Sequence, residues 1–224
     1  GMMSVWLYYT VLIFCCYQSA AETYDVFEEN GKKGLKDEQG HIIIPPKYEA
    51  LGWSDGSMSV INKVTGYKSN GLWGIIDLED HHITKATYFS LIPGEGDLLI
   101  AVKRSSLSFR LITGCIDTSG KEIIPFAYDG ITLHDFRLVV SVKSGTQYKY
   151  GLLDVENKTL IPVEHKAIER IGALRYSVKD FEGKCSLFTE NGKQLTAFTF
   201  DDIHPFKKNH AVIVKDGKQG IIDR

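Results

Sequence analysis

The sequence predicts an all-β fold, built from repeated antiparallel hairpins that form an open, solenoid-like stack. Three observations predict it: a recurring motif, tight-turn dipeptides within its copies, and no window with apolar residues at helical spacing. The motif Gly-x-x-Asp-x-x-Gly, leading to Ile-Pro, begins at Gly34 and returns at Gly114. Such a repeat indicates architecture more strongly than local propensity does, because each copy buries its apolar face against its neighbours.

The first glycine of each copy is the marker of the repeat. Successive marker slots lie 34 to 40 residues apart, and Cys185 stands in the slot of the fifth of six copies. An aspartate follows three positions later, with Phe188 as the exception in the copy of Cys185. The marker glycines and their aspartates are Gly34, Gly74, Gly114, Gly151 and Gly220, and Asp37, Asp77, Asp117, Asp154 and Asp223.

A tight hairpin is expected just before the marker glycine. Asn30-Gly31, Asn70-Gly71 and Asp216-Gly217 stand between strand-like residues, and such dipeptides tolerate the positive φ angles of a two-residue turn. The marker glycine itself is expected to admit the close approach of another backbone or of an aromatic ring.

A second turn is expected at each repeated aspartate. We expect the aspartate side chain to accept hydrogen bonds from backbone amides two or three residues ahead, as in Asp117 to Gly120. A short third strand such as residues 121–125 then ends at a proline, which cannot donate to a sheet. Tyrosine recurs a few residues later, at Tyr48, Tyr88 and Tyr128, and His165 and Thr199 hold this position in the weaker copies.

Residues 22–224 are therefore interpreted as one repeat domain. Its copies begin near residues 24, 60, 99, 138, 174 and 210. A β-propeller of five or six blades is the alternative, because a period of about 40 residues and four short strands suits a propeller blade.

These motifs resemble the WG-repeat family of bacterial proteins. Units of that family read Gly-Lys-Trp-Gly-Tyr-Ile-Asp, then Gly-Lys, Ile-Pro and Tyr-Asp, and residues 70–77 are the copy most similar to this pattern. The resemblance covers about residues 24 to 224 and implies a β-repeat scaffold, with no particular substrate. Trp73 is the only tryptophan that directly precedes a marker glycine, so a row of exposed tryptophans is not implied.

The first 21 residues predict export. They contain no charge, Val5 to Tyr17 is a 13-residue apolar and aromatic run, and Ser19-Ala20-Ala21 suits signal peptidase. The run is too short to span a bilayer, and no membrane span is expected in the mature chain. The expected location is the periplasm, the cell surface or the exterior. The alternative is a cytoplasmic protein in which residues 1–21 form a buried β segment of the array.

Composition and motifs give no sign of enzymatic chemistry. The formal net charge of −2 provides no basic surface for nucleic acid. There is no Walker loop, Cys-x-x-Cys pair or His-Glu-x-x-His motif, so no catalytic residue, metal ligand or cofactor is predicted. Asp80-His81-His82 is the nearest approach to a metal cluster, but it lies in a turn slot. Cys115 and Cys185 are expected to be buried free thiols.

The leading functional hypothesis is a non-enzymatic binding module. Five aromatic residues outside the tyrosine series are candidates for its surface, and at least two consecutive copies should expose them on one side: Trp53, Tyr67, Trp73, Tyr148 and Tyr176. Their partner would be a protein or a carbohydrate. An enzyme whose site is gathered from several copies and a structural spacer in an envelope complex are the alternatives.

Overall fold

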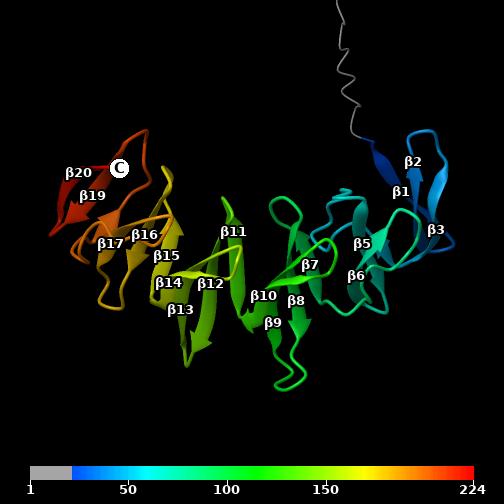
Figure 1. Cartoon of the computed structure of the whole chain (residues 1–224), viewed down its shortest axis with the longest axis horizontal. Coiled ribbons are helices and arrows are strands. Elements are labelled where there is room, and N and C mark those ends of the chain that lie inside the picture. The colour runs from blue at the N-terminus through cyan, green and yellow to red at the C-terminus, as the bar shows by residue number, and fades with distance from the viewer. Residues whose placement is uncertain (1–21) are drawn as a thin grey trace, which may run out of the picture.

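The computed structural model describes residues 22–224, so the predicted signal sequence lies outside the described residues. This part of the chain consists of β-strands and turns, without helices, and it therefore contains no helix able to cross a membrane. Six small antiparallel sheets lie side by side in an open arc, and the first and last sheets are at opposite ends (Figure 1). The predicted all-β, open architecture is confirmed.

The strands of each sheet follow one another in chain order. Sheet 1 contains β1 (Tyr24–Glu29), β2 (Lys32–Asp37) and β3 (Ile42–Tyr48). Sheet 2 contains β4 (Ala50–Leu51), β5 (Val64–Ser69) and β6 (Leu72–Asp77). Sheet 3 contains β7 (Ser90–Pro93), β8 (Leu98–Arg104), β9 (Leu111–Asp117) and β10 (Glu122–Tyr128).

The second half of the array has the same plan. Sheet 4 contains β11 (Gly130–His134), β12 (Arg137–Ser144), β13 (Gln147–Asp154) and β14 (Thr159–His165). Sheet 5 contains β15 (Ala167–Arg170), β16 (Arg175–Lys179) and β17 (Cys185–Thr189). Sheet 6 contains β18 (Asp202–Ile203), β19 (His210–Lys215) and β20 (Lys218–Asp223).

A complete unit has four strands, as in sheets 3 and 4, and the marker glycine lies on the third strand. In sheets 2 and 5 isolated bridges hold a fourth segment, for example Trp73 to Tyr88. Sheet 1 has no first strand and sheet 6 no fourth strand within the described residues. Sheets 2 to 6 begin at residues 50, 90, 130, 167 and 202, one strand before the starts expected from the sequence. An apolar residue shortly after the tyrosine position, such as Leu51 or Leu91, forms this short first strand.

The strand register corrects the marker assignment in the fifth copy. The residue before the marker pairs with the tyrosine position, as in Lys33 with Tyr48 and Thr113 with Tyr128. In sheet 5 the corresponding pair is Cys185 and Phe200. Cys185 therefore precedes the marker, Ser186 is the marker, and Phe200, not Thr199, holds the tyrosine position.

The turn after Ser186 explains the wrong assignment. Thr189 holds the place of the aspartate, and its hydroxyl oxygen accepts a hydrogen bond from the Lys193 amide at 3.1 Å. Phe188 is thus not an exception at the aspartate position; it is a buried core residue one position earlier. The fifth copy has neither the marker glycine nor the repeated aspartate, so its alignment with the other copies from sequence alone was wrong by one residue.

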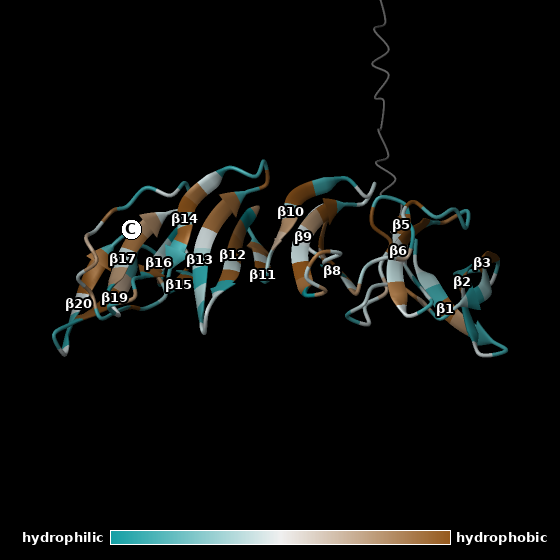
Figure 2. Cartoon of the chain, turned by 90° about the horizontal axis from the view of Figure 1, so that it is seen from below, coloured by the Kyte–Doolittle hydropathy of each residue, from teal (hydrophilic) through white to brown (hydrophobic). Residues whose placement is uncertain are grey.

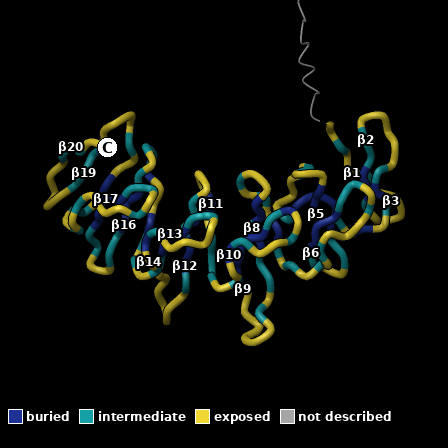
Figure 3. Tube along the Cα trace, viewed as in Figure 1, coloured by how far each residue is buried: buried dark blue, intermediate teal, exposed yellow. Residues whose placement is uncertain are grey.

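The core consists of five hydrophobic seams, one between each pair of consecutive sheets. We call the face that packs on the next sheet the forward face. The residue after the marker lies on this face and is at most 2% exposed in five copies: Leu35, Ile75, Cys115, Leu152 and Leu187. The buried backbone runs through the middle of the array, and the exposed turns lie at its edges (Figure 3).

The marker glycine admits the fourth strand, as predicted. A Cβ atom on Gly34, Gly114 or Gly151 would lie 2.7, 2.9 or 2.9 Å from a carbonyl oxygen of the fourth strand. In sheet 2, a Cβ atom on Gly74 would instead meet the ring of Tyr67 at 2.6 Å. The predicted hairpin turns are also present, because Asn30-Gly31, Asn70-Gly71 and Asp216-Gly217 all have positive φ angles.

Candidate functional site

The repeated aspartates stabilise turns. Asp77 Oδ1 accepts hydrogen bonds from the amides of Glu79 at 2.9 Å and His81 at 2.8 Å. Asp37, Asp117 and Asp154 make the same pair of bonds. The carboxylate oxygen thus accepts from the amides two and four residues ahead, whereas amides two or three residues ahead had been expected. Asp223 differs, since its contact is with His210 Nδ1 at 2.7 Å.

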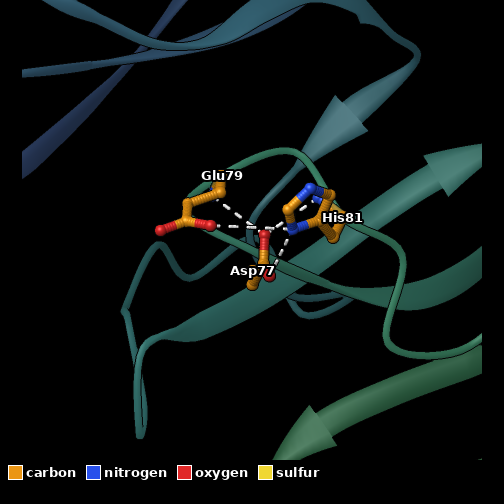
Figure 4. A group of neighbouring side chains, drawn as sticks. All are labelled: Asp77, Glu79 and His81. Atoms are coloured by element: carbon orange, nitrogen blue, oxygen red, sulfur yellow. Dashed lines mark hydrogen bonds and ion pairs between the residues drawn. The ribbon is translucent and has the colours of Figure 1, made fainter.

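One group of side chains has the composition of a metal site. Ligand atoms of Asp77, Glu79 and His81 lie within 4.8 Å of one another (Figure 4). The turn of sheet 1 argues for a structural role, because Asp37 Oδ2 lies 3.1 Å from His41 Nδ1, as Asp77 Oδ2 does from His81 Nδ1. In that turn Gln39 replaces the glutamate and the geometry persists. The Asp–His pair therefore belongs to the turn.

A second polar cluster lies between sheets 1 and 2. The Tyr48 hydroxyl donates to Asp80 at 2.5 Å and lies 2.9 Å from His82 Nε2, and the His82 ring stacks on Tyr67 at 4.3 Å. Lys47 Nζ contacts the other oxygen of Asp80 at 2.5 Å. Burial and the hydrogen bond to Asp80 raise the pKa of Tyr48, so the phenol stays protonated at neutral pH. This cluster fastens the two sheets together.

The structure corrects most of the aromatic candidates. Trp53, Tyr67 and Tyr176 are buried in seams, where Trp53 Nε1 donates to the Ser59 carbonyl at 3.0 Å. Trp73 is half-buried and packs against the seam between sheets 2 and 3. Only Tyr148 is exposed. The five residues do not form an aromatic ladder, because a repeat array needs its large side chains for the seams.

Other apolar side chains are exposed at the turns between second and third strands. The β8–β9 and β12–β13 hairpins project from the same side of the array (Figure 1). We define the hairpin-tip surface as the exposed apolar residues in these turns or within two residues of them in sheets 3, 4 and 5: Leu107, Phe109, Leu111, Tyr148 and Phe181. The sequence signal for it was the turn of residues 105–110, which is longer than the Asn-Gly turns of sheets 1 and 2.

The two cysteines of the described chain are buried free thiols, as predicted. Burial raises the pKa of Cys115 to about 11 and also raises the pKa of Cys185. Both thiols are therefore poor nucleophiles at neutral pH.

The WG containing repeat family matches residues 34–73, 114–137 and 187–218. No curated protein matches the chain significantly. A crystal structure of the eukaryotic initiation factor is 13% identical over 90% of this chain and 61% of its own, with a TM-score of 0.45. TolB from Acinetobacter baumannii is 16% identical over 77% of this chain and 50% of its own, with a TM-score of 0.33.

The WD40 β-propeller domain of Doa1 is 10% identical over 91% of this chain and 79% of its own, with a TM-score of 0.30. The chain spans less than two thirds of the length of the initiation factor structure and of TolB. Three segments of the chain thus match the model of the WG containing repeat, and the described residues form an open all-β array.

Proposed function

We propose that the protein is an exported, non-enzymatic protein-interaction module and that the hairpin-tip surface is its binding surface. The observation that carries this proposal is the exposure of Leu107 and Phe109, which are 93% and 71% exposed at the tip of the β8–β9 hairpin. Neighbouring exposed apolar side chains on a monomer surface commonly mark an interaction site.

The backbone at this tip supports the proposal. Phe109 has a φ angle of +59°, a conformation that is unfavourable for a bulky residue. An Arg104 guanidinium nitrogen donates to the Phe109 carbonyl oxygen at 2.7 Å and helps to hold this conformation. Because the Phe109 ring is exposed, no burial of the ring within the protein offsets the conformational free energy that the positive φ angle costs. Contact with a partner would offset it.

The flanking charges favour a protein partner with acidic groups beside its apolar residues. Lys103, Arg104 and Arg110 lie at the base of the β8–β9 tip, and Arg110 is paired with Asp129 at 2.5 Å. Aromatic residues and arginine are enriched in protein interfaces. The aliphatic Leu107 favours a protein over a carbohydrate, since sugar rings stack on aromatic faces.

Affinity capture with a paired variant tests the binding surface. The immobilised wild-type protein and a Leu107→Ser/Phe109→Ser variant are compared in extracts of the source organism by quantitative mass spectrometry. Ile42→Ser is the control, because Ile42 is exposed in sheet 1, two sheets away from the β8–β9 hairpin. A protein retained by the wild type and the control, but depleted about tenfold by the double variant, supports the proposal. Equal recovery by all three contradicts it.

Export is tested separately. Residues 1–21 are fused to a reporter enzyme that is active only outside the cytoplasm, and a fusion without them is the control. Reporter activity that depends on residues 1–21 is expected. Equal activity of the two fusions would favour the cytoplasmic alternative.

A further inference from the structure

In several sheets a carboxylate binds a backbone amide of the turn between the second and third strands. In sheet 4, Asp129 directly follows the tyrosine position, and its Oδ2 accepts a hydrogen bond from the Lys143 amide at 2.6 Å. In sheet 6, Asp201 follows the same position, and its Oδ2 accepts from the Asp216 amide at 2.8 Å. Hydrogen bonds from Lys184 and from the Asp216 amide hold the pKa of Asp201 below its ordinary value of 3.8. This position therefore favours an ionised carboxylate.

Sheets 2 and 5 hold the same turn with a different acid. In sheet 2 the acid is Glu49, whose longer side chain accepts from the Gly71 amide at 3.1 Å, one residue further along the turn. In sheet 5, Lys166 stands at the position of the acid, and Asp180 in the turn itself accepts from the Lys184 amide at 2.9 Å. In sheets 2, 4, 5 and 6 this turn thus has a carboxylate bound to its amides.

Sheet 3 has a phenylalanine where sheets 2, 4 and 6 have the acid. The Phe89 amide donates to the Val102 carbonyl at 2.7 Å, the same type of main-chain bond that Asp129 makes in sheet 4. Two residues after Val102 comes Arg104, whose amide corresponds to the Lys143 amide. Phe89 cannot accept a hydrogen bond from it.

The Arg104 amide points away from β9. The next amide, that of Ser105, donates across the hairpin to the Arg110 carbonyl at 2.7 Å. Successive amides of a strand point to opposite sides, so the Arg104 amide faces the side on which Phe89 lies. Within residues 22–224 no carboxylate bonds to an amide of this turn, where only serine hydroxyls accept, at 3.3 and 3.4 Å.

The charges beside this amide favour an anion. Lys103 Nζ lies 4.2 Å from the centre of the Phe126 ring, and Arg104 donates to the Phe109 carbonyl oxygen. Neither cation is paired with a carboxylate in the described chain. Figure 2 shows β8, β9 and β10 between the strands of sheets 2 and 4, and the acids of those two sheets are already bound to their own turns. Phe89 itself is 53% exposed, so the amide has an apolar neighbour that a partner can reach.

We propose that the protein partner of the hairpin-tip surface supplies the missing carboxylate. An aspartate or glutamate side chain of the partner accepts the Arg104 amide, and an apolar residue next to it packs on Phe89. This inference rests on the proposed function and names the chemistry of the segment that binds. The bond is charge-assisted, and the cations Lys103 and Arg104 favour the approach of an acidic group. Sheet 3 thus leaves open to a partner a bond that the other sheets make within the chain.

Nuclear magnetic resonance of the whole ¹⁵N-labelled protein tests the carboxylate site. The probe is the peptide acetyl-Leu-Glu-Phe-amide, and acetyl-Leu-Gln-Phe-amide is its neutral counterpart. The glutamate peptide should move the Arg104 amide proton downfield and saturably, and the glutamine peptide should move it much less. The amide protons of Lys143 and Asp216 are internal controls, because they already bond to carboxylates of the chain and should not respond.

A variant that restores the acid sharpens the test. Phe89→Asp should bind the Arg104 amide from within the chain, as Asp129 binds Lys143, so this proton should lie downfield without peptide. Its affinity for the glutamate peptide should fall about tenfold, the factor expected for one charge-assisted hydrogen bond. Phe89→Ser is the matched control, because it removes the ring without adding a charge, and it should keep the glutamate-dependent shift.

Equal shifts with the two peptides, or a Phe89→Asp variant that responds as the wild type does, overturn the carboxylate site. Adding Phe89→Asp to the affinity capture separates this failure from a failure of the hairpin-tip surface. A protein lost by Leu107→Ser/Phe109→Ser but retained by Phe89→Asp overturns the carboxylate site alone. Equal recovery by all variants, together with a glutamate-dependent shift of the Arg104 amide, contradicts the hairpin-tip surface alone.

Discussion

Sheet 4 and sheet 6 carry the same glycine-led third strand, but its residues have different physical roles in the two sheets. In sheet 4, Gly151 lies beneath β14 and Leu152 is fully buried. In sheet 6, no fourth strand covers Gly220 and no further sheet covers Ile221 within residues 22–224, and Ile221 is exposed. The comparison indicates that the marker residue and the residue after it contribute to stability through the sheet and the strand that cover them. Four predictions test it, from the largest expected effect to the smallest.

The largest difference is expected from removing the side chain after the marker. Leu152→Ala should lower the free energy of unfolding by about 2–5 kcal/mol, because it leaves a cavity in the seam between sheets 4 and 5. Ile221→Ala should change it by about 0.5 kcal/mol or less, as expected for an exposed side chain. Urea denaturation measures both. Equal costs would show that the end of the array is covered in solution.

A smaller difference is expected at the marker glycines. Gly151→Val should destabilise the protein by about 1–4 kcal/mol through overpacking. Its Cβ atom would lie 2.5 Å from Val163 Cγ2 and 2.9 Å from the Ile161 carbonyl oxygen. Gly220→Val should be neutral within about 0.5 kcal/mol. Thermal melts of the two variants test this difference. An unchanged melting temperature for Gly151→Val would contradict the claim that β14 packs closely only over a glycine.

The turn aspartates should differ by a smaller amount. Asp154 accepts two amide hydrogen bonds at 2.9 Å, whereas Asp223 contacts only the exposed His210. Asp154→Ala should therefore cost about 1–2 kcal/mol, and Asp223→Ala a few tenths. Denaturation at neutral pH compares them. A cost for Asp223→Ala that matched Asp154→Ala would show a turn role that the structure does not give it.

The smallest expected effect is the contribution of Asp117 to the loss of folding stability at acid pH. Burial tends to raise its pKa, but hydrogen bonds from Ser119 and Lys121 outweigh burial and hold the pKa below its ordinary value of 3.8. A depressed folded-state pKa contributes stability above the unfolded pKa that is lost as the pH falls below about 4. Asp117→Asn should flatten this part of the stability profile. Identical acid slopes for wild type and Asp117→Asn would contradict the assignment.

The candidate surfaces were harder to predict than the repeat. Trp53, Tyr67 and Tyr176 were expected on the outside because they fall outside the tyrosine series. Each packs in a seam, since large rings fill the space between neighbouring sheets. Leu107 and Phe109 were missed because the turn that carries them is longer than its counterparts in the other copies. A residue without a counterpart in other copies has no repeat pattern that could assign its face.

The sequence by itself determined the hairpins, most of the turn chemistry and the all-β class, whereas the choice between an open stack and a closed propeller came from the structure. Asn-Gly dipeptides and turn aspartates act through hydrogen bonds and φ angles within a few residues, and these do not depend on distant contacts. Only the tertiary structure decided the register of the fifth copy, the place of each aromatic ring and the open face of sheet 6. Burial is a property of two packed sheets, and an isoleucine or a glycine at the same repeat position is a core residue or a surface residue according to what lies against it.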